Sequence, residues 1–315
     1  TGTTNIFEIQ QAISQLHSGS NTALVMSIVM VLAGFGYKIS AVPFHFWTPD
    51  VYEGAPLSIT AYLSVAPKAA AFALMIRFFN QMLADGGAMS GLDSISSTQL
   101  PWPEILSLLA VVTMTLGNVV ALQQKSIKRM LAYSSIAHAG YMLLAMPVMS
   151  GDSIYAIMIY LVMYLFMNLG AFFVVISVKN KTGGETFDDY KGLGWEMPLV
   201  GAAMTLFMVS LTGLPPTAGF IGKFYIFASL IKGGEAFYWL VVIGGVNSVV
   251  SLYYYLKVVK VMYFDGDRKD QILSPPKTLT GAIIITAIPS LILGLYWNPI
   301  ADWVQNSLVF FIQTL

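Results

Sequence analysis

Hydrophobic runs of about twenty residues, separated by short polar segments, recur along the whole chain. A helix needs about 20 apolar residues to cross the hydrocarbon core of a bilayer, so each run is a candidate membrane span. The pattern predicts eight spans, over residues 21–47, 57–79, 104–122, 130–149, 154–178, 198–231, 237–264 and 279–297. We therefore expect an all-α polytopic membrane protein with eight transmembrane helices.

Two of these runs contain residues that interrupt a helix. The first ends in GYKISAVPFHFWTPD, which contains Pro43, and the sixth contains SLTGLPPTAGFIGKF, with Gly213, Pro215 and Pro216. Proline removes a backbone hydrogen bond that lipid cannot replace, although Pro and Gly are common in membrane helices. Interrupted helices at corresponding places in two repeats are typical of transporter sites. Because the two runs are five apart, the pattern predicts five-helix repeats.

Composition and charge agree with a membrane protein. Hydrophobic residues make up 56% of the chain, charged residues only 10%, and the mean hydropathy is +0.70, which excludes an ordinary soluble domain. Most of the sixteen basic residues fall in three alternate loops, as Lys125, Lys128, Arg129, Lys179, Lys181, Lys191, Lys257, Lys260, Arg268, Lys269 and Lys277. The positive-inside rule places these loops in the cytoplasm. Because the sequence begins with Thr1 rather than Met, we expect it to be part of a longer protein.

Three lysines lie inside the hydrophobic runs, namely Lys38, Lys68 and Lys223. A lysine at the centre of a membrane helix costs about 3 kcal/mol on insertion scales and usually marks an ion or proton pathway. One such lysine could instead anchor backbone carbonyls at a helix break, but three together favour a transport path. Burial disfavours the charged form, so these groups could exchange protons near neutral pH. All sixteen carboxylates fall in loops or at span ends, so we expect polar side chains rather than acids around the buried lysines.

The other candidate residues carry weaker signals. His45, beside the first interruption, could pass protons to Lys38 or hydrogen-bond a freed carbonyl. His138, in SSIAHAGYM, could continue a hydrated chain or serve helix packing. The chain has no cysteine and only three histidines, so we expect no disulfide, no metal site and no cysteine-ligated iron–sulfur cluster. The sixteen tyrosines are attributed to packing.

Four motifs in order resemble a known family. They are PFHFWTPDVYEGAP, SVAPKAAAFALMIRF, IKRMLAYSSIAHAGY and TGLPPTAGFIGKFYIF. Together they resemble the subunit N family of bacterial NADH-quinone oxidoreductase, or respiratory complex I, and its chloroplast, cyanobacterial and mitochondrial relatives. The related L and M subunits and the multisubunit sodium/proton antiporters share the lysines but differ around TPDVY. The resemblance covers nearly the whole chain.

The resemblance implies a fold and a set of site residues. The chain would hold helices seven to fourteen of a fourteen-helix, antiporter-like subunit. Residues 1–80 would end the first inverted five-helix repeat, residues 81–265 would form the second, and residues 266–315 would form a C-terminal helix and tail. The family's proton path falls on Lys38, Lys68 and Lys223. A glutamate of helix five, which pairs with the first of these lysines in the family, would precede the first residue of this chain.

The resemblance also implies an activity and a location. The chain would be a proton-translocating subunit of a quinone-reducing translocase in the bacterial inner membrane. Its partners would be neighbouring antiporter-like subunits, small membrane subunits and lipids, with no nucleic acid. Flavin, iron–sulfur clusters, NADH and quinone would bind to other subunits, leaving this chain without a cofactor. The alternatives are a subunit of a multisubunit sodium/proton antiporter and a purely structural membrane scaffold.

Overall fold

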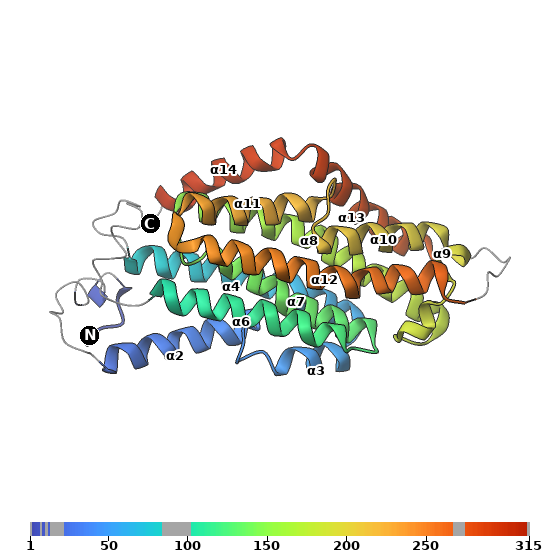
Figure 1. Ribbon diagram of the computed structural model, residues 1–315, viewed down its shortest axis with the longest axis horizontal. Coiled ribbons are helices and arrows are strands. Elements are labelled where there is room, and N and C mark those ends of the chain that lie inside the picture. The colour runs from blue at the N-terminus through green and yellow to red at the C-terminus, as the bar shows by residue number, and fades with distance from the viewer. Residues whose placement is uncertain are drawn as a thin grey trace.

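The fold is an elongated bundle of helices that lie side by side (Figure 1). The computed structural model describes residues 2–6, 8–9, 12, 22–83, 102–266 and 275–313, and no named strand occurs among them. The helices are α2 (Thr22–Ile39), α3 (Trp47–Gly54), α4 (Leu57–Leu83), α6 (Trp102–Leu122), α7 (Ile127–Leu144), α8 (Gly151–Thr182), α9 (Leu193–Glu196), α10 (Pro198–Thr212), α11 (Ala218–Lys232), α12 (Tyr238–Phe264), α13 (Lys277–Leu295) and α14 (Asn298–Gln313). Two short 3-10 turns cover Phe187–Tyr190 and Glu235–Phe237.

Fewer helices qualify as membrane spans than the sequence pattern predicts. In the described part of the chain, five helices are long and apolar enough to cross a membrane. A sixth span results if the segment Phe187–Glu196 and the helix Pro198–Thr212, which are bent against each other, are counted as one span. The helix α7 is short, and its first turn carries Lys128 and Arg129. The interrupted runs are divided into pieces of eight to 18 residues, which are too short to cross alone. The structure therefore supports an all-helical membrane protein but not the count of eight.

Both expected interruptions are present. The chain is non-helical from Ser40 to Phe46, between α2 and α3, and from Gly213 to Thr217, between α10 and α11. Gly213 ends α10 with a φ of 87°, a left-handed conformation that glycine adopts without strain. By contrast, Pro67 and Pro289 lie inside α4 and α13, which remain helical around them.

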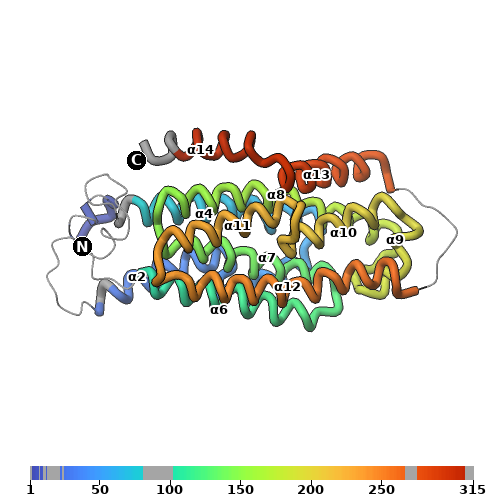
Figure 2. The backbone as a smooth tube through the Cα atoms, turned by 45° about the horizontal axis from the view of Figure 1, so that its top comes forward, coloured from blue at the N-terminus to red at the C-terminus, as the bar shows by residue number. Residues whose placement is uncertain are grey.

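The helix α7 is the centre of the bundle (Figure 2). It contacts α3, α4, α6, α8, α11 and α12, and all its residues except Arg129 and Tyr133 are buried. Its packing against α6 depends on Gly117 and Gly140, since a Cβ atom at either position would lie within 2.7 Å of a backbone nitrogen of the other helix. Small residues at such crossings let membrane helices approach closely. The side chains of α7 are thus fixed by neighbours on every side.

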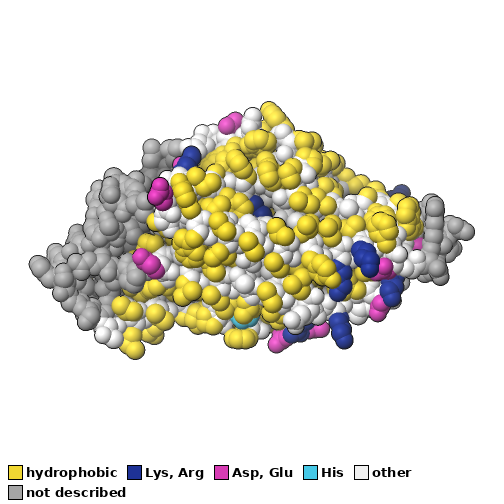
Figure 3. All heavy atoms as spheres, viewed as in Figure 1, with side chains coloured by type: hydrophobic (Ala, Val, Ile, Leu, Met, Phe, Trp, Pro, Cys, Tyr) yellow, Lys and Arg dark blue, Asp and Glu magenta, His cyan; other side chains and the backbone are white. Residues whose placement is uncertain are grey.

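Charged side chains gather at the ends of the bundle, while hydrophobic side chains cover most of its middle (Figure 3). The predicted basic loops meet at one end, where ion pairs connect them with the end of α3. Arg129 of α7 binds Asp50 at 3.2 Å and also Glu53, and Lys181 binds the buried Glu196. This charge distribution is that of a helix bundle whose middle lies in the apolar part of a bilayer.

Lys128 differs from the other lysines of the basic loops, because its side chain is only 2% exposed. Its ammonium group donates hydrogen bonds to the carbonyls of Glu53, at 3.0 Å, and Ala55, at 2.9 Å, and pairs with Glu185 at 3.5 Å. These carbonyls lie at the C-terminal end of α3, where a cation is favoured by the helix dipole. Lys128 therefore attaches the half-helix α3 to the start of α7.

We expect Lys128→Met to loosen α3 without unfolding the bundle. The methionine keeps most of the side-chain volume but leaves two carbonyls without their charged donor, a loss of about 2–3 kcal/mol. Hydrogen exchange of residues 47–55 in the purified full-length protein should accelerate. The control is Lys125→Met, whose side chain is exposed. Equal exchange in the two variants would show that Lys128 does not hold α3.

Candidate functional site

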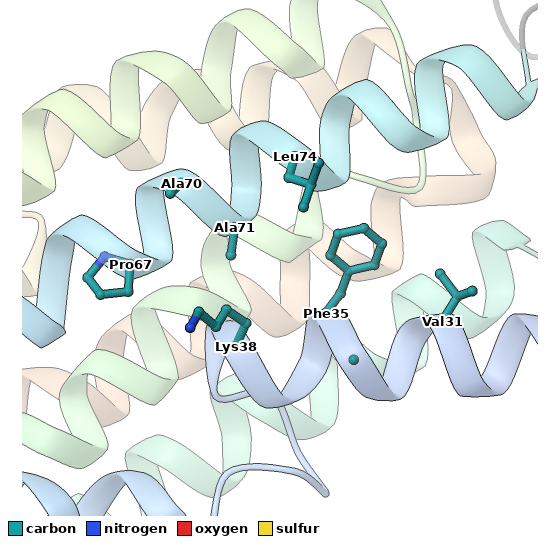
Figure 4. Close-up of a pocket in the computed structure, with 8 residues that line it drawn as sticks. Val31, Phe35, Lys38, Pro67, Ala70, Ala71 and Leu74 are labelled. Carbon is teal, nitrogen blue, oxygen red and sulfur yellow. The ribbon is translucent and has the colours of Figure 1, made fainter. Parts of the chain in front are cut away.

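Lys38 lies in the last turn of α2, two residues before the first interruption begins at Ser40. Its side chain is exposed in the described part of the chain, in contrast to those of Lys68 and Lys223. It lines a pocket of about 480 Å³ between α2 and α4, together with apolar side chains that include Phe35, Pro67 and Leu74 (Figure 4). Within the described residues no carboxylate forms an ion pair with it. Lys38 is thus a cation on an apolar face that is open in this chain.

His45 lies within the first interruption and is 4% exposed. Its ring packs on Phe46, with the ring centroids 4.4 Å apart. The Nδ1 atom is buried and has no hydrogen-bond partner among the described residues. The ring lies within hydrogen-bonding reach of the backbone of Pro43, in the same interruption, as expected for the second of the two roles considered, a hydrogen bond to a freed carbonyl.

Lys68 lies in α4 and is 1% exposed. Its ammonium group donates to the backbone carbonyl of Ser135, at 2.8 Å, and to the hydroxyl of the same residue. Both acceptors belong to α7, which places Lys68 at the α4–α7 contact. Two neutral oxygens from one serine therefore take the place of a carboxylate.

His138 lies at the centre of a chain of hydroxyl groups. Its Nδ1 atom is 2.7 Å from the hydroxyl of Tyr160 in α8, and its Nε2 atom is 3.0 Å from the hydroxyl of Tyr255 in α12. The Tyr255 hydroxyl is in turn 2.5 Å from the hydroxyl of Ser134, the neighbour of Ser135. One imidazole thus joins three helices through groups that both donate and accept protons.

Lys223 lies in α11, is 4% exposed, and reaches back across the second interruption. It donates to the carbonyl of Thr212, the last residue of α10, at 2.7 Å and to the hydroxyl of Ser248 at 3.2 Å. The ring of Tyr141 lies 4.3 Å from the ammonium nitrogen, in the range of a cation–π contact. Ser248 also donates to the Tyr141 hydroxyl at 3.3 Å. The interruption therefore supplies a freed carbonyl to this buried cation.

Sequence reasoning found the lysines, and it found His138 with Ser134, Ser135 and Tyr141 around it as a possible hydrated chain. It missed Tyr160 and Tyr255, which it attributed to packing and whose hydroxyls bind His138. The ring of Tyr141 lies against Lys223. The run YYYLK, residues 253–257, is a weak signal, since three consecutive tyrosines are costly in an apolar span unless their hydroxyls find partners. The two serines of SSIAH carry a similar signal, one turn before His138.

Comparisons of this sequence with a family model and with curated proteins point to the same family. The model of the family described as NADH:quinone oxidoreductase/Mrp antiporter, TM, matches residues 1–251. The NADH-quinone oxidoreductase subunit N 2 of Sorangium cellulosum (strain So ce56) is 54% identical over 279 residues, which cover 88% of this chain. The chain spans only 54% of that relative, about half its length.

Solved structures show a similar fold. A chain in respiratory complex I from Thermus thermophilus with bound aureothin superposes with a TM-score of 0.70 at 31% identity, covering 94% of this chain and 65% of that one. A chain in the Mrp complex from Dietzia sp. DQ12-45-1b superposes with a TM-score of 0.80 at 19% identity, covering 99% and 63% respectively. The second likeness concerns the fold alone.

Gly213→Ala should disturb the environment of Lys223. The new Cβ atom would lie 2.8 Å from Cδ of Lys223, on a backbone whose positive φ costs an alanine about 1 kcal/mol. Thermal unfolding of the purified protein should therefore occur at a lower temperature. Gly245→Ala in α12, where a Cβ meets open space, is the matched control. A Gly213→Ala protein as stable as the control would contradict this geometry.

Proposed function

Because the chain belongs to the NADH:quinone oxidoreductase/Mrp antiporter transmembrane family, we propose that it is the proton-translocating part of an NADH-quinone oxidoreductase subunit N. The main observation in support is the pair of buried lysines, Lys68 and Lys223, with the hydrogen-bonded chain of hydroxyl groups around His138 between them. Each lysine is held by neutral oxygens, so either can lose its proton without leaving an unpaired carboxylate in the membrane. Such groups can take up and release protons.

The route uses three clusters that α7 holds together. Lys68 binds Ser135, and the adjacent Ser134 begins the hydroxyl chain through Tyr255 to His138. His138 lies near the ring of Tyr141, with centroids 6.0 Å apart, and that ring lies against Lys223. A proton crosses from one cluster to the next by rotation of a hydroxyl group or through a water molecule. Because like charges repel strongly in a low-dielectric interior, we propose that the two lysines and His138 are not all protonated at the same time.

Lys38 completes the path at the first interruption. Its exposure on an apolar face between α2 and α4 supports a partner from outside this chain. We propose that this partner carries the glutamate that the family implies, in a segment that precedes Thr1. His45 remains a candidate relay between this pair and the interior.

The finer features of the fold belong to the same proposal. Each interrupted pair, α2 with α3 and α10 with α11, would count as one span, and α7 as another, which gives eight spans. Two of them would end the first inverted five-helix repeat, five would form the second, and α13 would be the C-terminal span. The end with the basic loops would face the cytoplasm of a bacterium, with the bundle in the inner membrane. The meeting of these loops at one end supports this orientation.

Redox chemistry is assigned to other chains. Flavin, iron–sulfur clusters and quinone would bind to partner subunits, among which antiporter-like and small membrane subunits would contact this chain. This chain is 54% identical to a protein named NADH-quinone oxidoreductase subunit N 2 but only 19% identical to the similar chain of the Mrp complex. This difference favours the proposal over a subunit of a sodium/proton antiporter. Copurification with flavin and iron–sulfur subunits separates the two. A scaffold role would leave the lysines replaceable.

Replacing Lys68 tests the proposed path. We expect Lys68→Ala to assemble and to lower proton pumping about tenfold or more, because the carrier is removed. Lys68→Arg should also impair pumping, since its guanidinium cannot lose a proton near neutral pH. Pumping is measured in membrane vesicles as acidification driven by NADH.

The control is Lys232→Ala, which removes an exposed lysine that pairs with Asp152 at 3.0 Å. It should pump normally. Normal pumping by both Lys68 variants would remove this lysine from the path and with it the main support for the proposal.

A further inference from the structure

A joint between two helices lies against the second interruption. The helix α13 ends at Leu295, within two residues of the end of the predicted span over residues 279–297, and α14 begins at Asn298. The two helices follow one another along the outside of the bundle (Figures 1 and 2). Pro289 does not explain this end, because α13 remains helical around it.

Near its C-terminal end, at Gly294, α13 packs directly against the second interruption. A Cβ atom there would lie 2.1 Å from the carbonyl oxygen of Pro216 and 2.5 Å from the Cα atom of Thr217. Both neighbours are backbone atoms, which cannot swing aside as a flexible side chain can. Only glycine therefore lets α13 seat against the segment that joins α10 to α11.

Two further contacts hold this joint. The indole nitrogen of Trp297, between α13 and α14, donates to the hydroxyl of Tyr225 in α11 at 3.1 Å. A small hydrophobic cluster, separate from the main core, contains Ile221 of α11, Leu293 of α13 and Val304 of α14. The half-helix α11 is therefore packed against residues on either side of the α13–α14 joint, from the end of α13 to the first turns of α14.

The position of Lys223 depends on the same segment. Its ammonium group belongs to α11, while its carbonyl acceptor, Thr212, belongs to α10, and residues 213–217 set the distance between them. A displacement of this segment changes how well the charged amine is held. Packing of α13 on the bundle alone would not require contact with these five residues.

We infer that the α13–α14 joint, through Gly294 and Trp297, positions Lys223 for proton transfer. Gly294 and Trp297 are positioning residues, because neither touches the ammonium group in the described structure. The inference rests on the proposed function of Lys223, but the mechanical part, that the joint holds residues 213–217, stands without it.

The main test compares Gly294→Ala with Gly281→Ala in the full-length protein in its native membrane. Gly281 lies in the same helix, and a Cβ there meets no atom within 4 Å. Each variant also carries Thr217→Cys, at a position that is 2% exposed, in a full-length background from which any other cysteine has been removed; residues 1–315 contain none. Labelling by N-ethylmaleimide should be about tenfold faster with Gly294→Ala, because overpacking displaces the segment, and unchanged with Gly281→Ala.

A second readout distinguishes positioning from loss of folded protein. The pH profile of pumping, measured without the thiol, should move its midpoint with Gly294→Ala and keep it with Gly281→Ala. Poor assembly alone lowers the rate equally at every pH. The titratable groups that interact with Lys223 are Tyr141 and His138 of α7, and His138 is in turn bound to Tyr160 of α8 and Tyr255 of α12. Neither variant replaces any of these residues.

The outcomes separate the inference from the proposed function. Equal labelling of both variants overturns the inference, and so does faster labelling with an unmoved pH profile. Faster labelling together with normal pumping by Lys223→Ala supports the mechanical part and overturns the proposed function. If Gly294→Ala does not assemble, Trp297→Phe, which removes the hydrogen bond to Tyr225 and part of the ring's packing, should still raise labelling and move the profile. No change in either readout overturns the inference.

Discussion

An ammonium group inside a bilayer-thick bundle is stable only where oxygen atoms replace its lost water. Lys68 and Lys223 meet this requirement differently. Lys68 takes the carbonyl and hydroxyl of a single serine on an intact helix, whereas Lys223 takes a carbonyl that is free because α10 ends there. Neither arrangement neutralises the charge, as a buried carboxylate would, so each lysine can give up its proton. The rest of the site follows from this choice of neutral partners.

The interruptions are tolerated because neighbouring helices supply the missing hydrogen bonds. The amide of Val42, in the first, donates to the Thr113 hydroxyl of α6 at 3.1 Å, and the amide of Gly219, after the second, donates to the Ser210 hydroxyl at 3.1 Å. Irregular backbone at membrane depth is stable only when protein or water covers it in this way. The same cover keeps the freed carbonyl of Thr212 available for Lys223.

The sequence indicated the site where a residue raises the free energy of a membrane helix and therefore needs a specific partner. A lysine or a Gly-Pro-Pro segment in an apolar run needs a reason, so Lys68, Lys223 and both expected interruptions could be found. Tyr160 and Tyr255 could not, because an aromatic residue is ordinary in such a run. Lys128 was assigned to a loop because it lies near a span end, and its burial depends on α3, distant in sequence. The exposure of Lys38 depends on which segments cover α2. The end of α13 lies close to the end of the predicted span and shortly before Pro299, but its contact with residues 213–217 depends on packing between segments distant in sequence.

The arrangement of rigid and interrupted helices limits where the site can change shape. The helix α7 is buried on nearly all sides and bound to α3 through Lys128, so Ser134, Ser135 and His138 keep fixed positions. The segments with few internal hydrogen bonds are those that flank the lysines, and local opening is easiest in such segments. A change in the charge of Lys223 alters its bond across residues 213–217, which in turn bear on the α13–α14 joint. Proton occupancy is thus tied to the geometry of a helix interruption on the outer side of the bundle, while the hydroxyl chain at its centre stays in place.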